Sequence, residues 1–388
     1  MPTSQFKCLV CETGRLEAIE GYPELPRVTS DCKPWPAGGA LACCEACGAV
    51  QKLPDDKWLG EIARIYNAYQ IYGLSDGAEQ VIFSEAGVAA PRSRALVDFI
   101  AGNAGTASAG KLIDIGCGNG SALKNLSAAL PDWKLYGSEL SDSARAGLER
   151  LPNFVELYTR PASEIAERFD IVTMIHALEH MQHPLAALRD ATRLFTEGGR
   201  LFIEIPNVLT SPFDVLIADH LLHFSPAHLK YLASRAGLAV SILRDDLLPK
   251  EITCLAARGE AIVQRPKPAA TREIVRANIT WLAAVLAEAR KAATKARSFG
   301  LFGTSISGMW LHGALREKVS FFVDEDESRV GNCFEGIPIL APSQAPPGST
   351  VFVPLAPEVA SRIATRHGGA RVSYIEPPAR RQRATSPL

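Results

Sequence analysis

The feature that most constrains this chain is an apolar run at residues 111–115 that breaks into closely spaced glycines. Gly116, Gly118 and Gly120 follow the run, and a helical pattern begins directly after them at residue 121. This order predicts a buried strand, a tight turn and the start of a helix. Glycines are needed in such a turn because side chains would keep the backbone away from a ligand lying across the carboxyl end of the strand.

The glycine spacing separates two classes of cofactor. A dinucleotide fingerprint places its third glycine three positions after the second, and that position is Ser121 here, so NAD is disfavoured. The tighter spacing, together with the acidic Asp114, resembles motif I of class I S-adenosylmethionine (SAM) methyltransferases. That resemblance implies a backbone cradle for the methionine part of SAM, with Asp114 ordering the loop or contacting the amino group.

A second acidic residue supports a nucleoside site. The apolar run at residues 133–139 ends in Glu139, nineteen residues after Gly120. A carboxylate at that strand end can accept hydrogen bonds from both ribose hydroxyls of a nucleoside. We therefore predict SAM as the cofactor.

Length and charge bound the class of protein. A chain of 388 residues exceeds one ordinary core, so two or three domains are expected. A net charge of -1 gives no indication of nucleic-acid binding. Because the sequence starts without an apolar secretory segment and contains no long uninterrupted apolar run, we expect a soluble cytoplasmic protein without a membrane partner.

The cysteines indicate a metal site. Six of the nine precede residue 48, and two Cys-x-x-Cys pairs stand out, namely Cys8 with Cys11 and Cys44 with Cys47. Each pair places two thiolates on one tight knuckle, and two knuckles make a tetrahedral sulfur set that suits structural Zn²⁺. Cys43 remains an alternative to Cys44 as the ligand.

The whole pattern predicts an α/β chain in five parts. Residues 1–56 form the zinc-binding module, and residues 57–105 form a helical lid or linker. Within the latter, tyrosines spaced by three, including Tyr66, Tyr69 and Tyr72, line one helical face, either as core packing or as a lid over the cofactor.

Residues 106–262 alternate between strand and helix patterns, which predicts a parallel sheet with helices on both faces. Seven strands are expected, at residues 111–115, 133–139, 154–158, 169–175, 199–205, 239–243 and 252–257. Together with the glycine turn, this predicts a class I SAM methyltransferase, Rossmann-like sheet.

Residues 263–378 predict a long helix from Thr271 to about residue 297, followed by a smaller Rossmann-like lobe. Residues 303–308 in that lobe fit either a phosphate-binding helix start or a plain turn. Residues 379–388 are expected to form a flexible tail.

Two histidine clusters follow predicted strands, where ligands of such sheets bind. The first contains His176 and His180, and the second contains Asp219, His220 and His223. His176 directly follows a strand, which makes it a candidate for cofactor binding. No carboxylate completes a zincin pattern, so a histidine general base fits better than a catalytic metal.

The whole layout resembles the nucleotide-sugar C-methyltransferases. The resemblance rests on the paired cysteine knuckles, the glycine turn, residues 178–180, residues 213–225, and residues 323–338. It implies that His220 is the catalytic histidine, His180 a second active-site histidine, and Asp219 the acidic residue beside the base. Tyr69 or Tyr72 takes the place of a tyrosine on the SAM side.

Two positions depart from that family. Ile217 stands where the family usually has a tyrosine, and Asp219 where it usually has glutamate. The acceptor can therefore differ even if methyl transfer is retained. In the mechanism that the resemblance implies, His220 takes a proton beside a sugar ketone while His180 stabilises the oxyanion. Asp219 holds or polarises the base, and the C-terminal lobe binds the nucleotide. The alternatives are O- or N-methylation of another saccharide or small metabolite, and a non-catalytic scaffold that binds zinc and nucleotide.

Overall fold

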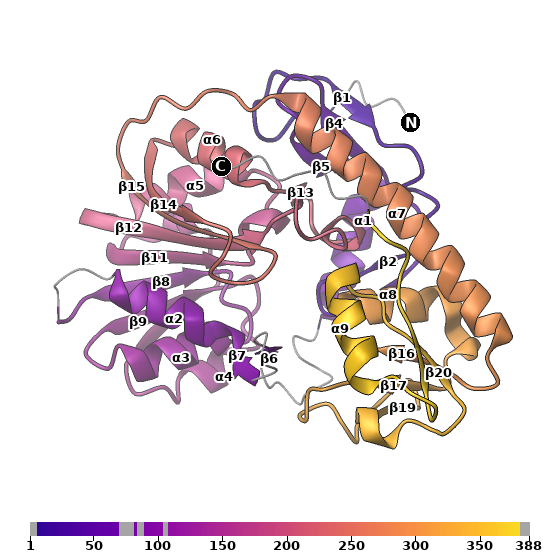
Figure 1. Ribbon diagram of the computed structural model, residues 1–388. Helices are drawn as coiled ribbons and strands as arrows, with labels where there is room; N and C mark the ends of the chain where they lie inside the picture. Colours follow the sequence, from indigo (N-terminus) through magenta and orange to yellow (C-terminus); the bar gives the residue numbers. More distant parts are fainter. Residues whose placement is uncertain (1–5, 70–80, 84–88, 104–107, 381–388) are drawn as a thin grey trace.

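The computed structural model describes residues 6–69, 81–83, 89–103 and 108–380. Its central sheet has seven strands in the order β10-β9-β8-β11-β12-β15-β14, seen edge-on in Figure 1. The strands are β8 (Lys111–Ile115), β9 (Lys134–Ser138), β10 (Phe154–Tyr158), β11 (Phe169–Ile175), β12 (Phe195–Pro206), β14 (Leu238–Arg244) and β15 (Glu251–Arg258). This confirms the predicted seven-stranded class I methyltransferase sheet.

One strand departs from the predicted parallel arrangement. β15 runs antiparallel to both of its neighbours, β12 and β14. The reason is local, because no helix separates β14 from β15 and the short connection at residues 245–250 turns the chain straight back. β14 thus enters the sheet at its edge and β15 fills the position between it and β12.

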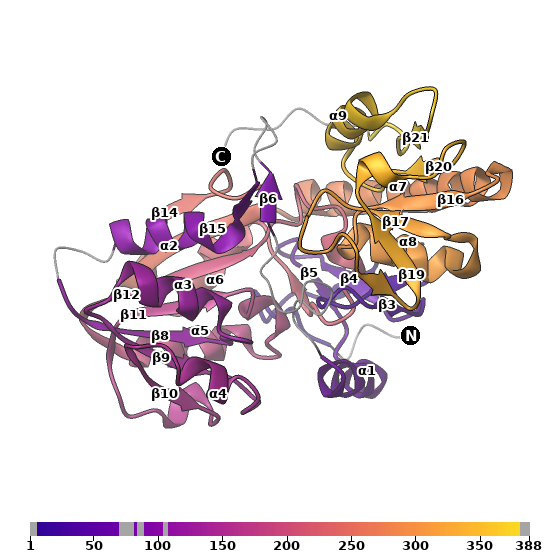
Figure 2. The same cartoon turned by 90° about the horizontal axis from the view of Figure 1, so that it is seen from below.

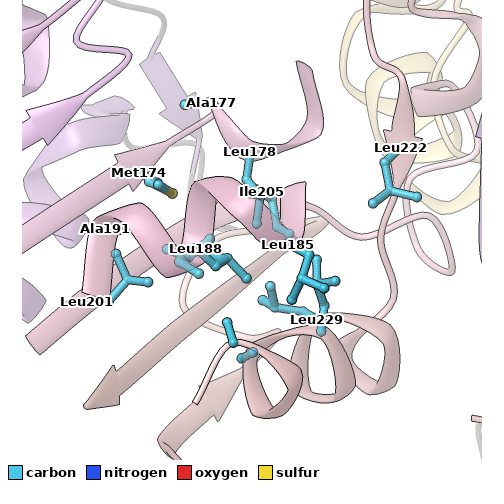
Figure 3. Packing of buried hydrophobic residues seen from close by; sticks show 14 of the residues in the cluster. Met174, Ala177, Leu178, Leu185, Leu188, Ala191, Leu201, Ile205, Leu222 and Leu229 are labelled. Atoms are coloured by element: carbon cyan, nitrogen blue, oxygen red, sulfur yellow. The ribbon is translucent and has the colours of Figure 1, made fainter. Parts of the chain in front are cut away.

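Helices cover both faces of this sheet. α2 (Arg92–Gly102) and α3 (Ser121–Ala129) pack on one face, against Leu112 and Leu135. α5 (Pro184–Arg193) and α6 (Pro226–Arg235) pack on the other, against Ile113 and Val172. Figure 3 shows Leu185 and Leu188 of α5 facing Leu229 of α6 beneath the sheet. The alternation of Leu112 and Ile113 between faces is what a strand buried on both sides requires.

The N-terminal module contains a small separate sheet. Its order is β1 (Leu16–Ala18), β4 (Leu41–Cys44), β5 (Val50–Lys52) and β13 (Leu222–His223). The fourth strand therefore comes from the region that carries the second histidine cluster. Leu222 also belongs to the hydrophobic cluster that contains Cys8 and Leu229, so this module and the central sheet share one core.

The predicted helical lid is only partly helical. α1 (Asp56–Asn67) ends well before residue 83, and β6 (Val81–Phe83) pairs with β7 (Ala89–Pro91) as an antiparallel hairpin. Tyr72 lies outside the described residues.

A long helix follows the central sheet in the chain and runs from beside the N-terminal module to the C-terminal lobe (Figure 1). α7 (Pro268–Lys295) begins at Pro268, and Lys267 rather than Thr271 is its N-cap, because proline is well suited to the first turn. The lobe has a six-stranded sheet in the order β18-β19-β17-β16-β20-β21. Those strands are β16 (Phe299–Phe302), β17 (Phe321–Val323), β18 (Cys333–Phe334), β19 (Ile337–Leu340), β20 (Thr350–Phe352) and β21 (Ser373–Ile375), with α8 (Ile306–Leu315) and α9 (Pro357–His367) beside them.

Figure 2 shows the lobe and the central sheet on opposite sides of the N-terminal module. Among the described residues, no helix combines the length and the apolarity that crossing a membrane would need.

Candidate active site

A cavity of about 1510 Å³ lies where these parts meet. It is lined by the glycine loop at residues 116–119, by His180 and His220, and by residues 304–307 of the C-terminal lobe. Small-molecule pockets usually measure roughly 300–1,000 Å³, so this one has room for a cofactor and a second ligand. The carboxyl ends of β8, β9 and β11 open into it, as expected for a sheet of this type.

The glycine loop is shaped by close packing. Gly116 has φ +75° and a Cβ added to it would lie 2.7 Å from the Cβ of Ala177, so the protein itself excludes a side chain there. The backbone N–H of Gly118 donates to Glu139 Oε2 at 2.8 Å. Asp114 accepts from the Thr173 hydroxyl at 2.6 Å, and burial raises the pKa of Asp114 to about 7. Asp114, Gly116, Gly118 and Glu139 all line the cavity, as expected if they bind the cofactor that the sequence predicts.

The His220 ring is held by the carboxylate of Asp214, a residue that the sequence pattern did not indicate. Asp214, in a 3-10 turn at Asp214–Leu216, accepts from His220 Nδ1 at 2.7 Å and from His223 Nδ1 at 2.6 Å. Burial alone would lower the pKa of His220, but the hydrogen bond to Asp214 raises it above its ordinary value. Burial disfavours the charge on Asp214, yet the two imidazoles hold its pKa well below the usual range. His220 therefore has Nε2 as its remaining nitrogen and is a strong base for an imidazole.

Asp219 makes no hydrogen bond to the His220 ring, although its charge contributes to raising the pKa of His220. Its carboxylate accepts from the Ser30 N–H at 2.8 Å and from the Ser30 hydroxyl at 2.5 Å. Its backbone carbonyl accepts from His180 Nδ1 at 3.0 Å. Asp219 thus positions His180 and the N-terminal module, because consecutive residues in this extended loop point in different directions.

His180 and His220 lie together even though forty residues separate them. Their ring centroids are 4.7 Å apart, with the rings nearly perpendicular. Burial lowers the pKa of His180, and the neighbouring His220 adds to the effect. His180 is therefore neutral, and since its Nδ1–H donates to the Asp219 carbonyl, its Nε2 offers a lone pair rather than a proton.

Two tyrosines of the predicted lid line the same cavity. The Tyr66 hydroxyl lies 3.2 Å from His180 Nδ1, and the Tyr69 hydroxyl lies 2.9 Å from the Ser30 hydroxyl. The two rings pack edge to face with centroids 5.9 Å apart. Burial raises the pKa of both phenols, which keeps them protonated.

His176 lies in a charged cluster at the end of β11. It has φ +50°, its Nδ1 is 3.1 Å from Glu179 Oε1, and its Nε2 contacts the Arg92 guanidinium. Burial, reinforced by Arg92, lowers the pKa of His176 to about 3. The ring lines the cavity beside the glycine loop.

The four predicted zinc ligands come together. One sulfur from each of Cys8, Cys11, Cys44 and Cys47 lies within 4.8 Å of all the others. The closest pairs are 3.6 Å apart, near the roughly 3.8 Å expected for a tetrahedron with Zn–S bonds of about 2.3 Å. The Val10 and Cys11 N–H groups both point at Cys8 Sγ at 3.4 Å, as for a metal-bound thiolate.

Two neighbours of this set also matter. The Cys43 thiol points away, toward the Gly48 carbonyl, so Cys44 is the residue that faces the other sulfurs. His228 of α6 donates from Nε2 to the Cys47 carbonyl at 2.8 Å and contacts Ser225 through Nδ1, which ties the cysteine set to the central domain. The donor set and its surroundings fit Zn²⁺.

The central part of the chain matches a known family. Residues 88–241 match the family described as "Methyltransferase domain". Two curated relatives are named ubiquinone biosynthesis O-methyltransferase. The protein of Aromatoleum aromaticum is 33% identical over 141 residues, which cover 34% of this chain and 58% of the relative. The protein of Aeromonas salmonicida is 28% identical over 166 residues, which cover 37% and 69%. The chain thus spans a little over half to two thirds of these relatives.

Solved structures similar to this chain include a SAM-dependent methyltransferase of Clostridium acetobutylicum, with 12% identity and a TM-score of 0.36 over 53% of this chain and 98% of the other. Human N-acetylserotonin methyltransferase in complex with SAM has 16% identity and a TM-score of 0.37 over 43% of this chain and 51% of the other. The family match and the strand order make the central part of this chain a SAM-dependent methyltransferase domain.

Proposed function

We propose that the whole chain is a methyltransferase that adds the SAM methyl group to a carbon of a keto-deoxysugar carried on a nucleotide. The observation that carries this proposal is the Asp214–His220 pair in the cavity that also contains the glycine loop. Oxygen and nitrogen acceptors need a base but no enolate, whereas a carbon acceptor needs a base strong enough to form an enolate. An imidazole whose pKa is raised by a carboxylate is suited to that step.

In this mechanism His220 Nε2 takes the proton from the carbon beside the ketone, and Asp214 stabilises the imidazolium that forms. The enolate carbon would then be the nucleophile for the methyl group of SAM, whose bond to the sulfonium sulfur would break and leave S-adenosylhomocysteine. SAM supplies the activated methyl on a sulfonium, so the protein needs to provide a base, alignment and exclusion of water. The residues that would hold SAM are Asp114, Glu139, His176 and the backbone at Gly116, Gly118 and Gly120.

Tyr66 is the best-placed donor for the enolate oxygen. His180 Nδ1–H points at both the Asp219 carbonyl and the Tyr66 oxygen, which leaves the phenolic hydrogen of Tyr66 free. This replaces His180 in the role of oxyanion donor, because neutral His180 has no second proton to give. It also supplies a phenol to a pocket in which Ile217 stands where the resembling family has tyrosine.

The C-terminal lobe supports an anionic acceptor. Ser305, the N-cap of α8, and Ser307 line the cavity at the start of that helix, where backbone N–H groups and the helix dipole favour negative charge. Arg329 donates to the Thr304 hydroxyl at 3.1 Å, and Arg362 of α9 lies on the same wall. A nucleotide diphosphate would place its charge here and its sugar toward His220.

Solvent deuterium exchange tests the proposal. With a panel of 4-keto sugar nucleotides and without methyl transfer, the enzyme should incorporate deuterium beside the ketone, and His220→Gln should abolish the incorporation. His183→Gln is the matched control, because His183 lines the same cavity without contacting Asp214. Tyr66→Phe should slow exchange by about tenfold or more. If the wild type methylates its acceptor without any exchange, the enolate mechanism is wrong.

O-methylation is the second candidate, and the names of the two curated relatives favour it. Such an enzyme would also use His220 as a base, but on a hydroxyl. It would turn over without deuterium exchange, and its product would carry the methyl on oxygen by NMR. A scaffold without catalysis would show neither turnover nor exchange.

A further inference from the structure

β13, the strand that follows His220, belongs to the sheet of the N-terminal module. β13 pairs antiparallel with β5, placing Leu222 opposite Gln51 and His223 opposite Val50. The Lys52 N–H donates to the Leu221 carbonyl at 2.8 Å and continues the ladder. The loop that carries His220 is therefore anchored on residues that directly follow the Cys44–Cys47 knuckle.

Lys52 makes the decisive side-chain contacts. Lys52 is only 1% exposed. Its ammonium donates to the Ile217 carbonyl at 2.6 Å and to the His220 carbonyl at 2.9 Å. The third short contact is to His223 Nε2 at 3.1 Å. An ammonium has three protons and no lone pair, so these three partners use its whole donor capacity.

The charge on Lys52 determines which nitrogens of His223 and His220 donate and which accept. Burial lowers the pKa of Lys52 to about 7. In its charged form below that pH, Lys52 can only donate, so His223 Nε2 accepts and the His223 proton is on Nδ1, the nitrogen that faces the Asp214 carboxylate. Nδ1 then donates to one Asp214 oxygen, and His220 Nδ1 donates to the other. Burial and the Lys52 charge lower the pKa of His223 to about 4, which keeps it neutral. The other charged groups around Lys52 are Asp214, Arg27, Asp219 and Glu61.

We propose that Lys52 is a positioning residue for the base: it holds the Ile217 and His220 carbonyls and, through neutral His223, keeps the Asp214 carboxylate facing His220 Nδ1, so that His220 Nε2 is free for the substrate. The catalytic consequence rests on the proposed function, but the tautomers do not. The N-terminal module thereby influences the orientation of the base through the Lys52 side chain, in addition to any effect on stability.

NMR of the full chain with ¹⁵N-labelled histidine tests the tautomers without substrate. The His223 signals are assigned by their loss in His223→Gln. In the wild type, His223 should carry a proton on Nδ1 only and should not titrate between pH 5.5 and 8. In Lys52→Met, His223 should become protonated on Nε2 within that range. Unchanged His223 signals in a Lys52→Met protein that still binds SAM would overturn the proposal.

A pair of substitutions at His223 keeps the test independent of whether Lys52→Met folds. In His223→Gln the side-chain carbonyl can accept from Lys52 while its NH₂ group donates to Asp214, so the polarity is retained. In His223→Leu both contacts are lost. His220 should stay protonated on Nδ1 in the first variant and become a mixture of tautomers in the second. Identical His220 spectra in the two variants would contradict the relay.

The kinetic readout separates positioning from general damage. Lys52→Met and His223→Leu should lower the exchange rate by about tenfold or more, with His223→Gln close to wild type and SAM affinity by calorimetry unchanged in all three. If the wild type exchanges no deuterium with any keto sugar, the proposed function fails while the NMR result still decides the role of Lys52.

Discussion

Asp214 holds two imidazoles, one on each carboxylate oxygen, and this single residue sets the state of the candidate base. Asp214→Asn replaces one oxygen with an NH₂ group that cannot accept, so one imidazole must change tautomer. We expect kcat to fall about 100-fold or more with little change in SAM affinity, measured by turnover and calorimetry. Asp190→Asn, at another aspartate on the cavity wall, should be near wild type. Equal losses in both variants would contradict the assigned role.

The sequence predicted the histidines of this site better than their partners. His180 was recognisable because its cluster begins directly after a strand, and His220 because the family resemblance places the catalytic histidine there. The resemblance also points to Asp219, which adjoins His220, but the 3-10 turn at Asp214–Leu216 brings the earlier carboxylate to the His220 ring. Lys52 gave no signal in the sequence, because the partners of its ammonium at Ile217, His220 and His223 lie 165 to 171 residues away.

The glycine loop is the element on which the cofactor site depends, and its tightness can be tested. Gly116→Ala combines a positive φ with a contact of 2.7 Å to Ala177 Cβ, an atom that cannot rotate away. Gly198→Ala is the matched control, because Gly198 has φ +79° but nothing within 4 Å of an added Cβ. We expect Gly198→Ala to cost about 1 kcal/mol of unfolding free energy and Gly116→Ala about 1–3 kcal/mol more, by urea denaturation. Equal costs would show that the contact is relieved.

Elements with strong periodicity were predictable, and those that depend on distant partners were not. All seven strands of the central sheet were located, but the direction of β15 required noticing that no helix precedes it. The first helix of the helical segment expected over residues 57–105 ends at Asn67, since tyrosine spacing alone does not exclude a later hairpin. The two-residue strand β13 exists only because β5 offers it an edge.

At the scale of the whole molecule, metal loss should affect both stability and catalysis, because the cysteines share a hydrophobic cluster with the central sheet. Cys47→Ser should lose zinc, lower the thermal unfolding midpoint and abolish turnover. Cys43→Ser, at the adjacent buried thiol that points away, should retain zinc and activity. Metal analysis should give one zinc per chain. Two would indicate a second ion at Glu179, His180 and His220, which also bring donor atoms within 4.8 Å of one another.

Acid should destabilise the fold through its buried neutral imidazoles. His223 and His176 have folded pKa values of about 4 and about 3, lowered chiefly by burial, against about 6.5 in an unfolded chain. Between pH 6.5 and 4 the unfolded state binds more protons, so stability falls as the pH is lowered. His223, which is 1% exposed, alone corresponds to about 3 kcal/mol by pH 4. Urea denaturation at pH 7 and 5 should show the loss, and His223→Gln should reduce it.

The domain boundaries were the hardest feature to predict, because one sheet is built from segments that lie far apart in the sequence. Residues 1–56 read as a self-contained unit, yet their sheet is completed by residues 222–223 and their cysteine set is held by His228. Nothing in the spacing of cysteines reports such a contact.

That borrowed strand limits how enzymes of this design can exchange parts. A chimera that takes its N-terminal segment from one parent and its catalytic loop from another would pair two edges selected in different backgrounds. Recombination should therefore succeed only when residues 44–52 and 214–228 are inherited together, so this lineage should evolve the two segments as one unit.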